Sequence, residues 1–354
     1  MSPSIRGGGF KIYLCVRDRG SRIVRLPSTK FKRKKGSTLE NIQINTSRII
    51  ITGAAGLVGQ NLIPRLKQRF QGQIVAIDKH ANNLRILENL HPDVTIVRAD
   101  LSREGAWSDY FSSQSFVVLN QAQIGGLRYE EFETNNIGAT RNILNAAVTG
   151  GVPYIVHMSS SVVNSKAVDW YTETKKAQEA LVDSCPIPHS VLRPTLMFGW
   201  FDRKHLGWLR RFMERSPVFP IPGNGRFLRQ PLYVGDLCSI IVSCLDRKTV
   251  GTYDITGLEK IDYIDLIRKI RNIVNTRTLM MPIPYTLFEL LLRTYALFDR
   301  NPPFTVSQLE ALVVPDIFDV IDWPGIFGVE PTSLDDALHE TFLNPIYSGV
   351  VLDF

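Results

Sequence analysis

The stretch Arg48-Ile49-Ile50-Ile51-Thr52-Gly53-Ala54-Ala55-Gly56-Leu57-Val58-Gly59 decides the expected fold. Its first five residues form a short, β-branched apolar run, which is typical of a strand buried in a parallel sheet. Gly53 permits a tight turn, Gly56 lets the backbone approach a pyrophosphate, and Gly59 lets the next helix pack closely on the strand. The stretch predicts a strand, a glycine turn and a helix over 60–70 whose N-terminus binds an anion. An ordinary structural turn is the alternative.

Further strands and helices alternate along the next hundred residues. Apolar runs predict strands at 73–77, 94–101, 116–120 and 154–158, and a helix at 135–149. This alternation predicts an α/β fold with a Rossmann-type, doubly wound parallel sheet. His157, in the last of these strands, is expected to be a core histidine and not a ligand.

An acidic residue ends the second predicted strand. Asp78 follows Gly59 by 19 residues, where a carboxylate can accept hydrogen bonds from the adenosine ribose hydroxyls of a dinucleotide. Because an acid repels a 2′-phosphate, NAD is favoured over NADP, while Lys79 and Arg85 keep NADP as an alternative. Asp100, at the end of the third strand, either borders the adenine or forms a surface turn.

Tyr171 and Lys175 lie four positions apart, and therefore on one face of a predicted helix. A free phenol titrates near pH ~10, so tyrosine is a base at neutral pH only where a cation stabilises its phenolate, as Lys175 can. Ser160, at the end of the fifth strand, is expected to hold the reacting hydroxyl or carbonyl. Ser161 competes for this role because the serine run allows either register. A surface pair on an amphipathic helix is the alternative for tyrosine and lysine.

With these residues the sequence resembles the extended short-chain dehydrogenase/reductase superfamily, which includes NAD-dependent nucleotide-sugar epimerases and dehydratases and hydroxysteroid dehydrogenases. The resemblance covers residues 48–260. It rests on the glycine motif, Asp78, Asp100-Leu101, Asn136 with Thr140 and Asn142, Ser159-Ser160, Tyr171 with Lys175, and Arg193-Pro194. It implies that Tyr171 is the acid/base, that Lys175 binds the nicotinamide ribose and lowers the tyrosine pKa, and that Ser160 orients the substrate oxygen.

The segment Pro220–Asp236 resembles the Gly-x-Gly-x-x-x-Arg-x-x-x-x-Val-x-Asp segment of nucleotide-sugar enzymes in this family. The resemblance implies that Arg229 contacts the substrate diphosphate, a role that suits a permanently charged, bidentate donor. A structural pair between Arg229 and Asp236 is the alternative. The chain also departs from the family, since residues 120–123 read Asn-Gln-Ala-Gln in place of His-Leu-Ala-Ala, and residues 194–199 lack an expected asparagine.

The expected site residues fall into three groups. The cofactor-binding residues are predicted to be Gly53, Ala55, Gly56, Leu57, Val58, Gly59, Asp78, Asp100, Leu101, Asn136, Tyr171 and Lys175. The catalytic residues are predicted to be Ser160, Tyr171 and Lys175, and the substrate-binding residues Ser160, Ser161 and Arg229. No metal is expected, because the four cysteines are scattered without a C-x-x-C pair.

We expect three parts along the chain: an N-terminal extension at 1–46, an NAD(P)-binding Rossmann domain at 47–190, and a substrate-binding lobe at 191–354, partly interleaved with the sheet. Proline-rich joints beyond residue 261 make this lobe smaller and mostly helical. Its apolar Leu287, Leu290 and Leu291 are expected to face the core.

Composition excludes several classes of protein. With 44% hydrophobic and 21% charged residues among 354, the chain is neither disordered nor collagen-like. It has no run of ~18 uncharged apolar residues, so no transmembrane segment is expected. The cysteines suggest no disulfide framework, which fits a reducing, cytoplasmic compartment. The net charge of +7 resides at the N-terminus, where residues 1–35 hold eleven Lys/Arg and one acid, so no nucleic-acid binding is expected of the body.

The basic extension has three interpretations: a solvated or unnatural arm, a surface for anionic membranes or nucleic acid, and a transit peptide. For the body, the leading hypothesis is an NAD-dependent enzyme acting on a nucleotide-activated sugar, as an epimerase or dehydratase. The alternatives are a dehydrogenase or reductase of a sterol-like or other alcohol with a dissociable NAD(P), and a non-catalytic nucleotide-binding accessory protein. By resemblance a homodimer is also expected.

Overall fold

The computed structural model describes residues 44–166, 168–295 and 306–353. The predicted N-terminal extension lies outside the described residues except for its last three positions. The described residues belong to one compact unit. The predicted division into 1–46, 47–190 and 191–354 stays a prediction.

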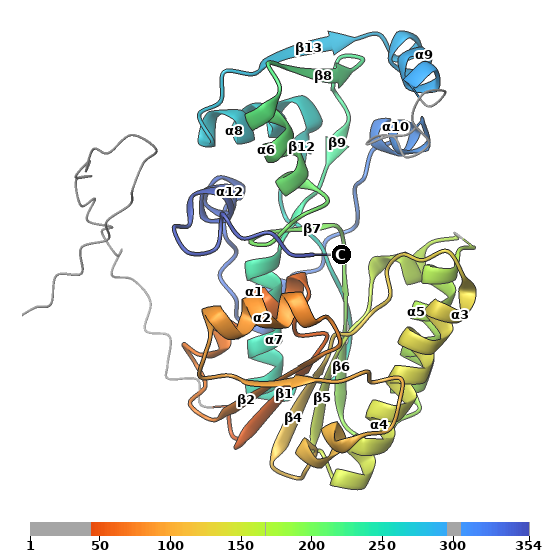
Figure 1. Cartoon of the computed structure of the whole chain (residues 1–354), viewed down its shortest axis with the longest axis vertical. Coiled ribbons are helices and arrows are strands. Elements are labelled where there is room, and N and C mark those ends of the chain that lie inside the picture. The colour runs from red at the N-terminus through yellow and green to blue at the C-terminus, as the bar shows by residue number, and fades with distance from the viewer. Residues whose placement is uncertain (1–43, 167, 296–305, 354) are drawn as a thin grey trace, which may run out of the picture. The chain divides into compact units, whose positions relative to one another are not determined.

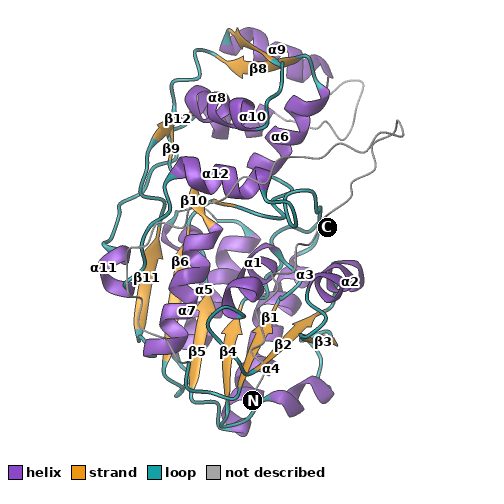
Figure 2. Ribbon diagram, turned by 90° about the vertical axis from the view of Figure 1, so that its left-hand side faces the viewer, coloured by secondary structure: helices purple, strands orange, loops and turns teal. Residues whose placement is uncertain are grey.

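Seven parallel strands of the described chain form one sheet, in the order β11-β6-β5-β4-β1-β2-β3 (Figure 2). They are β1 (Arg48–Thr52), β2 (Gln73–Asp78), β3 (Thr95–Arg98), β4 (Ser115–Leu119), β5 (Tyr154–Met158), β6 (His189–Pro194) and β11 (Gly251–Ile255). The strand order reverses between β1 and β4, and ligands of open α/β sheets bind beyond the carboxyl ends of the strands at such a point. The predicted Rossmann-type parallel sheet is confirmed.

Helices cover both faces of this sheet (Figure 1). One face carries α1 (Leu57–Leu66), α2 (Ala81–Leu90) and α7 (Val234–Arg247), and the other carries α3 (Tyr129–Phe132), α4 (Ala139–Gly150) and α5 (Trp170–Asp183). Successive side chains of a strand point to opposite faces. Accordingly Ile49 and Ile51 lie in the core under α1 and α7, while Ile50 lies in the core under α4.

The C-terminal lobe has a core of its own, formed around Phe198, Phe219, Ile221, Ile267 and Leu338. Its helices are α6 (Leu206–Arg215), α8 (Tyr263–Ile273), α9 (Tyr285–Tyr295), α10 (Val306–Val313) and α12 (Leu334–Leu343). Its strand pairs are β7 (Met197–Phe198) with β10 (Leu232–Tyr233), β8 (Val218–Pro222) with β13 (Leu279–Ile283), and β9 (Leu228–Arg229) with β12 (Ile261–Asp262). The predicted helical C-terminal portion is confirmed.

The predicted burial of the apolar stripe on α9 was wrong. The exposed fractions of Leu287, Leu290 and Leu291 are 46%, 59% and 52%. The prediction failed because periodicity shows that three side chains share a helix face and does not show what covers that face. His157 is fully buried, as expected.

Close packing at the glycine turn explains why position 59 is a glycine. A Cβ on Gly59 would lie 2.4 Å from the Ala54 carbonyl oxygen and 2.6 Å from its Cα. The start of α1 is therefore pressed against the turn that precedes it.

Within the described residues, no helix is long and apolar enough to cross a membrane. No group of three His, Cys, Asp or Glu side chains in this part of the chain is placed to hold a metal ion.

Candidate active site

The glycine turn after β1 has the geometry of an anion-binding loop. Gly53 has φ +62°, and a Cβ there would lie 2.7 Å from the Gln121 Cα, so only glycine fits. Gly56 is the extended N-cap of α1, and no described side chain caps this helix end. The backbone N–H groups of Leu57 and Val58 thus begin the helix where its dipole favours an anion. A Cβ on Gly56 would contact only the Gly53 carbonyl oxygen, at 3.4 Å.

Asp78 joins the glycine loop to the turn after β2. Its Oδ2 accepts a hydrogen bond from the Ala55 N–H at 3.0 Å, and its Oδ1 accepts one from the His80 N–H at 3.0 Å. Each carboxylate oxygen has a second lone pair, which a ribose hydroxyl can use. Lys79 is held elsewhere, since its Nζ donates to Asn135 Oδ1 at 2.7 Å.

Asp100 forms the turn that the sequence left as an alternative. Its Oδ1 accepts from the Ser102 N–H at 3.0 Å and from the Ser102 hydroxyl at 2.7 Å. Burial alone would raise the pKa of Asp100, but the bonds from Ser102 outweigh it and hold the pKa below its usual value. Leu101 is buried, and its carbonyl accepts from the Asn142 amide at 3.1 Å. Both residues lie at the carboxyl end of β3.

Asn136 lies in a π-helical turn, η2 (Glu133–Gly138), before α4, and such turns are frequent at functional sites. Its Nδ2 donates to the Gln123 carbonyl at 3.1 Å and to Thr174 Oγ1 at 2.9 Å, while its Oδ1 accepts from the Gln123 N–H at 2.6 Å. The buried amide therefore ties the loop after β4 to α5, on which the predicted catalytic residues lie. This geometry is that of a positioning group.

Sequence reasoning missed the role of Asn120 and Gln121, although their departure from the family pattern was the available signal. The Thr52 hydroxyl donates to Gln121 Oε1 at 2.6 Å and accepts from the Asn120 N–H at 3.0 Å. The Asn120 amide also donates to the Gly53 carbonyl at 3.0 Å. These polar residues fix the loop after β4 beneath the glycine turn.

Tyr171 lies in the first turn of α5, which Asp169 caps by accepting from the Thr172 N–H at 2.9 Å. Burial raises the pKa of Tyr171, the side chain of Ser160 lowers it, and the charge of Asp169 raises it. Of the two candidate serines, Ser160 is the one whose side chain acts on the pKa of Tyr171. Ser161 starts the following 3₁₀ turn, η3 (Ser161–Asn164). The structure thus brings Ser160 and Tyr171 together at the carboxyl end of β5.

Lys175 lies one helical turn further along the same face of α5. Its side chain is only 1% exposed, and its Nζ donates to the Met158 carbonyl at 2.7 Å. Burial lowers the pKa of Lys175 to about 7, with Glu179 opposing the shift. The Glu179 carboxylate accepts a hydrogen bond from Ser159 and pairs with Arg193 at 2.6 Å. The ammonium is therefore held at the end of β5 in a medium of low dielectric constant.

Arg229, on β9, lies over the Phe227 ring at 5.3 Å and feels the charge of Asp316, but part of its guanidinium makes no hydrogen bond in the described structure. Its Nε and Nη2 are buried and make no hydrogen bond within the described structure. The predicted alternative pair with Asp236 does not form, and the Asp236 carboxylate instead accepts from the Thr332 hydroxyl at 2.6 Å. Burial raises the pKa of Asp236 to about 6, and Thr332 opposes this rise. Buried donors are nearly always paired, so two adjacent free N–H groups indicate a place for an anion.

In the structure the predicted site residues form two groups, and Arg229 belongs to neither. Gly53, Gly56 and Asp78 surround the start of α1, while Ser160, Tyr171 and the buried Lys175 lie at the carboxyl end of β5 and the start of α5. No hydrogen bond or ion pair joins Arg229 to either group among the residues described here. The first group fits a dinucleotide. It offers a helix N-terminus without a side-chain cap, a glycine at position 56 whose only neighbour in the place of a Cβ is the Gly53 carbonyl oxygen, at 3.4 Å, and the Asp78 carboxylate with free lone pairs.

Comparisons with known proteins identify the family of this chain. The model of the NAD dependent epimerase/dehydratase family matches residues 49–256. A Mus musculus protein, NADH dehydrogenase (ubiquinone) 1 alpha subcomplex subunit 9, mitochondrial, is 26% identical over 297 residues, which cover 80% of this chain and 77% of that protein.

Two solved structures share the fold. The Bordetella bronchiseptica enzyme WbmG in complex with NAD has a TM-score of 0.66 at 16% identity, covering 86% of this chain and 96% of that one. The UDP-glucuronic acid 4-epimerase from Bacillus cereus in complex with NAD has a TM-score of 0.65 at 21% identity, covering 85% of this chain and 99% of that one.

Proposed function

The chain belongs to the NAD-dependent epimerase/dehydratase family, and from this premise we propose that it binds NAD and epimerises or dehydrates a nucleotide-activated sugar. The observation that carries the proposal is the position of Lys175, which is buried one turn beyond Tyr171 on α5 and donates to the Met158 carbonyl at the strand end that leads into Ser160. This arrangement suits proton transfer to or from the oxygen of a hydroxyl or carbonyl group.

NAD would be held by the residues around the start of α1. The backbone N–H groups of Leu57 and Val58 would bind its pyrophosphate, and Asp78 its adenosine ribose. The family and the NAD complexes of the two structural neighbours support this cofactor. When bound, NAD supplies the acceptor for a hydride from the sugar ring.

Tyr171 would remove the proton from the reacting sugar hydroxyl at its phenolic oxygen. Burial works against the phenolate, because it raises the pKa of Tyr171. The Ser160 side chain offsets this by lowering that pKa, and it would hold the reacting oxygen beside Tyr171. The Lys175 ammonium, fixed on the Met158 carbonyl, supplies the positive charge that favours the phenolate.

Arg229 would bind the diphosphate of the substrate. Its free Nε and Nη2 match two phosphate oxygens, and such bidentate contacts are among the stronger hydrogen bonds in proteins. A nucleotide diphosphate contributes the anion that the two free donors lack, and for this reason a nucleotide sugar is proposed over a neutral alcohol.

Arg229→Ala is expected to weaken binding of UDP-glucose or dTDP-glucose by about tenfold or more, because a charge-assisted bidentate contact is lost. NAD affinity is expected to stay within about twofold. Calorimetric titration of each ligand measures both. Arg226→Ala is the matched control, since Arg226 lies on the same segment and pairs on the surface with Asp262 at 2.7 Å. Equal losses for sugar nucleotide and NAD would contradict the diphosphate assignment.

A second candidate is a dehydrogenase or reductase of a lipid-like alcohol that releases its cofactor in each cycle. The exposed leucines of α9, Leu287, Leu290 and Leu291, favour it, because they offer apolar surface on the C-terminal lobe.

The nucleotide retained by the purified protein separates the two candidates. The protein is purified without added cofactor and denatured, and the released nucleotides are identified by chromatography and mass. Near-stoichiometric NAD is expected, since an epimerase or dehydratase returns its hydride and has no need to release the cofactor. Empty protein that binds NAD reversibly would favour the second candidate. Protein that never binds NAD would contradict both.

A further inference from the structure

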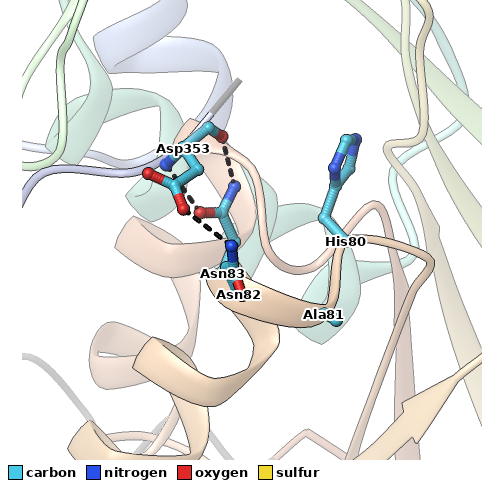
Figure 3. Close-up of a pocket in the computed structure, with 5 residues that line it drawn as sticks. All are labelled: His80, Ala81, Asn82, Asn83 and Asp353. Atoms are coloured by element: carbon cyan, nitrogen blue, oxygen red, sulfur yellow. Dashed lines mark hydrogen bonds between the residues drawn. The ribbon is translucent and has the colours of Figure 1, made fainter.

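A small hollow lies immediately beyond Asp78, at the start of α2. It is lined by His80, Ala81, Asn82, Asn83 and Asp353 (Figure 3). The first four follow β2 directly, and the N–H of His80 donates to the Asp78 carboxylate at 3.0 Å. The turn after β2 therefore connects the Asp78 carboxylate to the residues that line this hollow.

Asp353 reaches the hollow from the far end of the described chain. Its backbone is clamped by Asn83, whose Nδ2 donates to the Asp353 carbonyl at 2.8 Å and whose Oδ1 accepts from the Asp353 N–H at 2.8 Å. Asn83 is buried, while Asp353 itself is exposed. Leu352, also fully buried, packs in a cluster with Trp200 and Phe201. The position of Asp353 is thus fixed by two buried neighbours.

The Asp353 carboxylate is directed at the first turn of α2. Its Oδ2 accepts from the Asn82 amide at 3.0 Å, while the His80 ring points away from it (Figure 3). No side chain caps this helix among the described residues. A helix N-terminus favours a negative charge, and here a side chain of the protein itself supplies that charge.

We infer that Asp353 is a specificity-determining residue, whose carboxylate excludes the 2′-phosphate of NADP from the hollow beyond Asp78. The inference rests on the proposed function, since it presupposes that a dinucleotide binds at the glycine loop. NAD carries no phosphate at this position and is unaffected by the charge. The 2′-phosphate of NADP would meet two carboxylates, those of Asp78 and Asp353, and would compete with Asp353 for the start of α2.

Asp353→Asn removes the charge and keeps the size of the side chain. The dissociation constant of NADP is expected to fall by about threefold to tenfold, while that of NAD changes by less than about twofold. Asp353→Arg is expected to extend the gain, because it offers the phosphate a cation. Both effects are expected to shrink as ionic strength rises. Fluorescence titration of NADH and NADPH on the purified full chain measures the two constants without any turnover.

Asp109→Asn is the matched control, because it removes the same charge from the exposed turn η1 (Ala106–Tyr110) at the amino end of β1. An unchanged ratio of the NADP and NAD constants in both Asp353 variants would overturn the inference while leaving the proposed function intact. A shift of equal size in the Asp109 variant would also overturn it, since net charge alone would be the cause. A wild-type chain that binds neither dinucleotide would overturn the proposed function and the inference with it.

Discussion

Tyr171→Phe is expected to lower kcat by about 10² to 10⁴-fold, because it removes the one hydroxyl placed to carry the substrate proton. NAD affinity is expected to stay within a few fold, since the glycine loop and Asp78 are untouched. The melting temperature is expected to change little, because the phenyl ring keeps its place on α5. Steady-state kinetics, NADH fluorescence titration and thermal unfolding measure the three quantities.

Tyr253→Phe is the matched control for this substitution. The Tyr253 hydroxyl makes an exposed hydrogen bond to the Val250 carbonyl at 3.0 Å, on β11. It is expected to retain full activity. If Tyr171→Phe lost NAD binding and stability together with activity, Tyr171 would be a structural residue and the assignment of the acid/base would fail.

Lys175→Met is expected to abolish turnover and, unusually for a buried substitution, to stabilise the fold at pH 7. Burial lowers the pKa of Lys175 to about 7, well below the usual lysine value, so the unfolded chain binds the proton more tightly than the folded chain. The charge therefore costs stability at neutral pH, on the order of 1 to 4 kcal/mol. Methionine fills a similar volume without that cost.

The pH dependence gives the sign of this effect. The folded pKa lies below the unfolded one, so the free energy of unfolding of the wild type rises with pH above about 7, because the folded lysine has then released its proton while the unfolded lysine still holds it. The stability difference between Lys175→Met and the wild type is expected to shrink between pH 7 and pH 9. Urea unfolding at both pH values measures it.

Lys176→Met serves as the control, because Lys176 is exposed and pairs only loosely with Glu173, at 3.4 Å. Its stability is expected to follow the wild type at both pH values. A Lys175→Met variant that is less stable than the wild type by the same amount at pH 7 and pH 9 would contradict the prediction, because it would show that the charge of Lys175 does not cost stability.

The local features of the site were predictable from the sequence. The glycine spacing after β1 predicted the turn at Gly53, because only glycine tolerates the φ of Gly53. The helix was predicted over 60–70, whereas α1 begins three residues earlier and spans Leu57–Leu66. The four-residue spacing of Tyr171 and Lys175 placed them on one face of α5. Such features depend on neighbours within one or two turns of chain, which a sequence displays directly.

Features that depend on distant segments were not predictable. The clamp between Asn83 and Asp353 joins residues 270 positions apart, and nothing near either residue indicates the other. Whether Arg229 pairs with Asp236 was open in the sequence, because the answer depends on Thr332, which takes the Asp236 carboxylate. Exposure of the α9 leucines was predicted wrongly for the same reason, since the packing partners of a helix lie elsewhere in the chain.

The measurement that tests the central proposal most directly is conversion of nucleotide sugars by the purified chain. The protein is incubated with NAD and, separately, with UDP-glucose, UDP-glucuronic acid, UDP-N-acetylglucosamine, dTDP-glucose and GDP-mannose, and the products are resolved by NMR and mass spectrometry. The proposal predicts an isomer or a dehydrated product from at least one of them, without net accumulation of NADH, and no product with Tyr171→Phe. A chain that binds NAD and leaves every sugar nucleotide unchanged, or a Tyr171→Phe variant as active as the wild type, would contradict it.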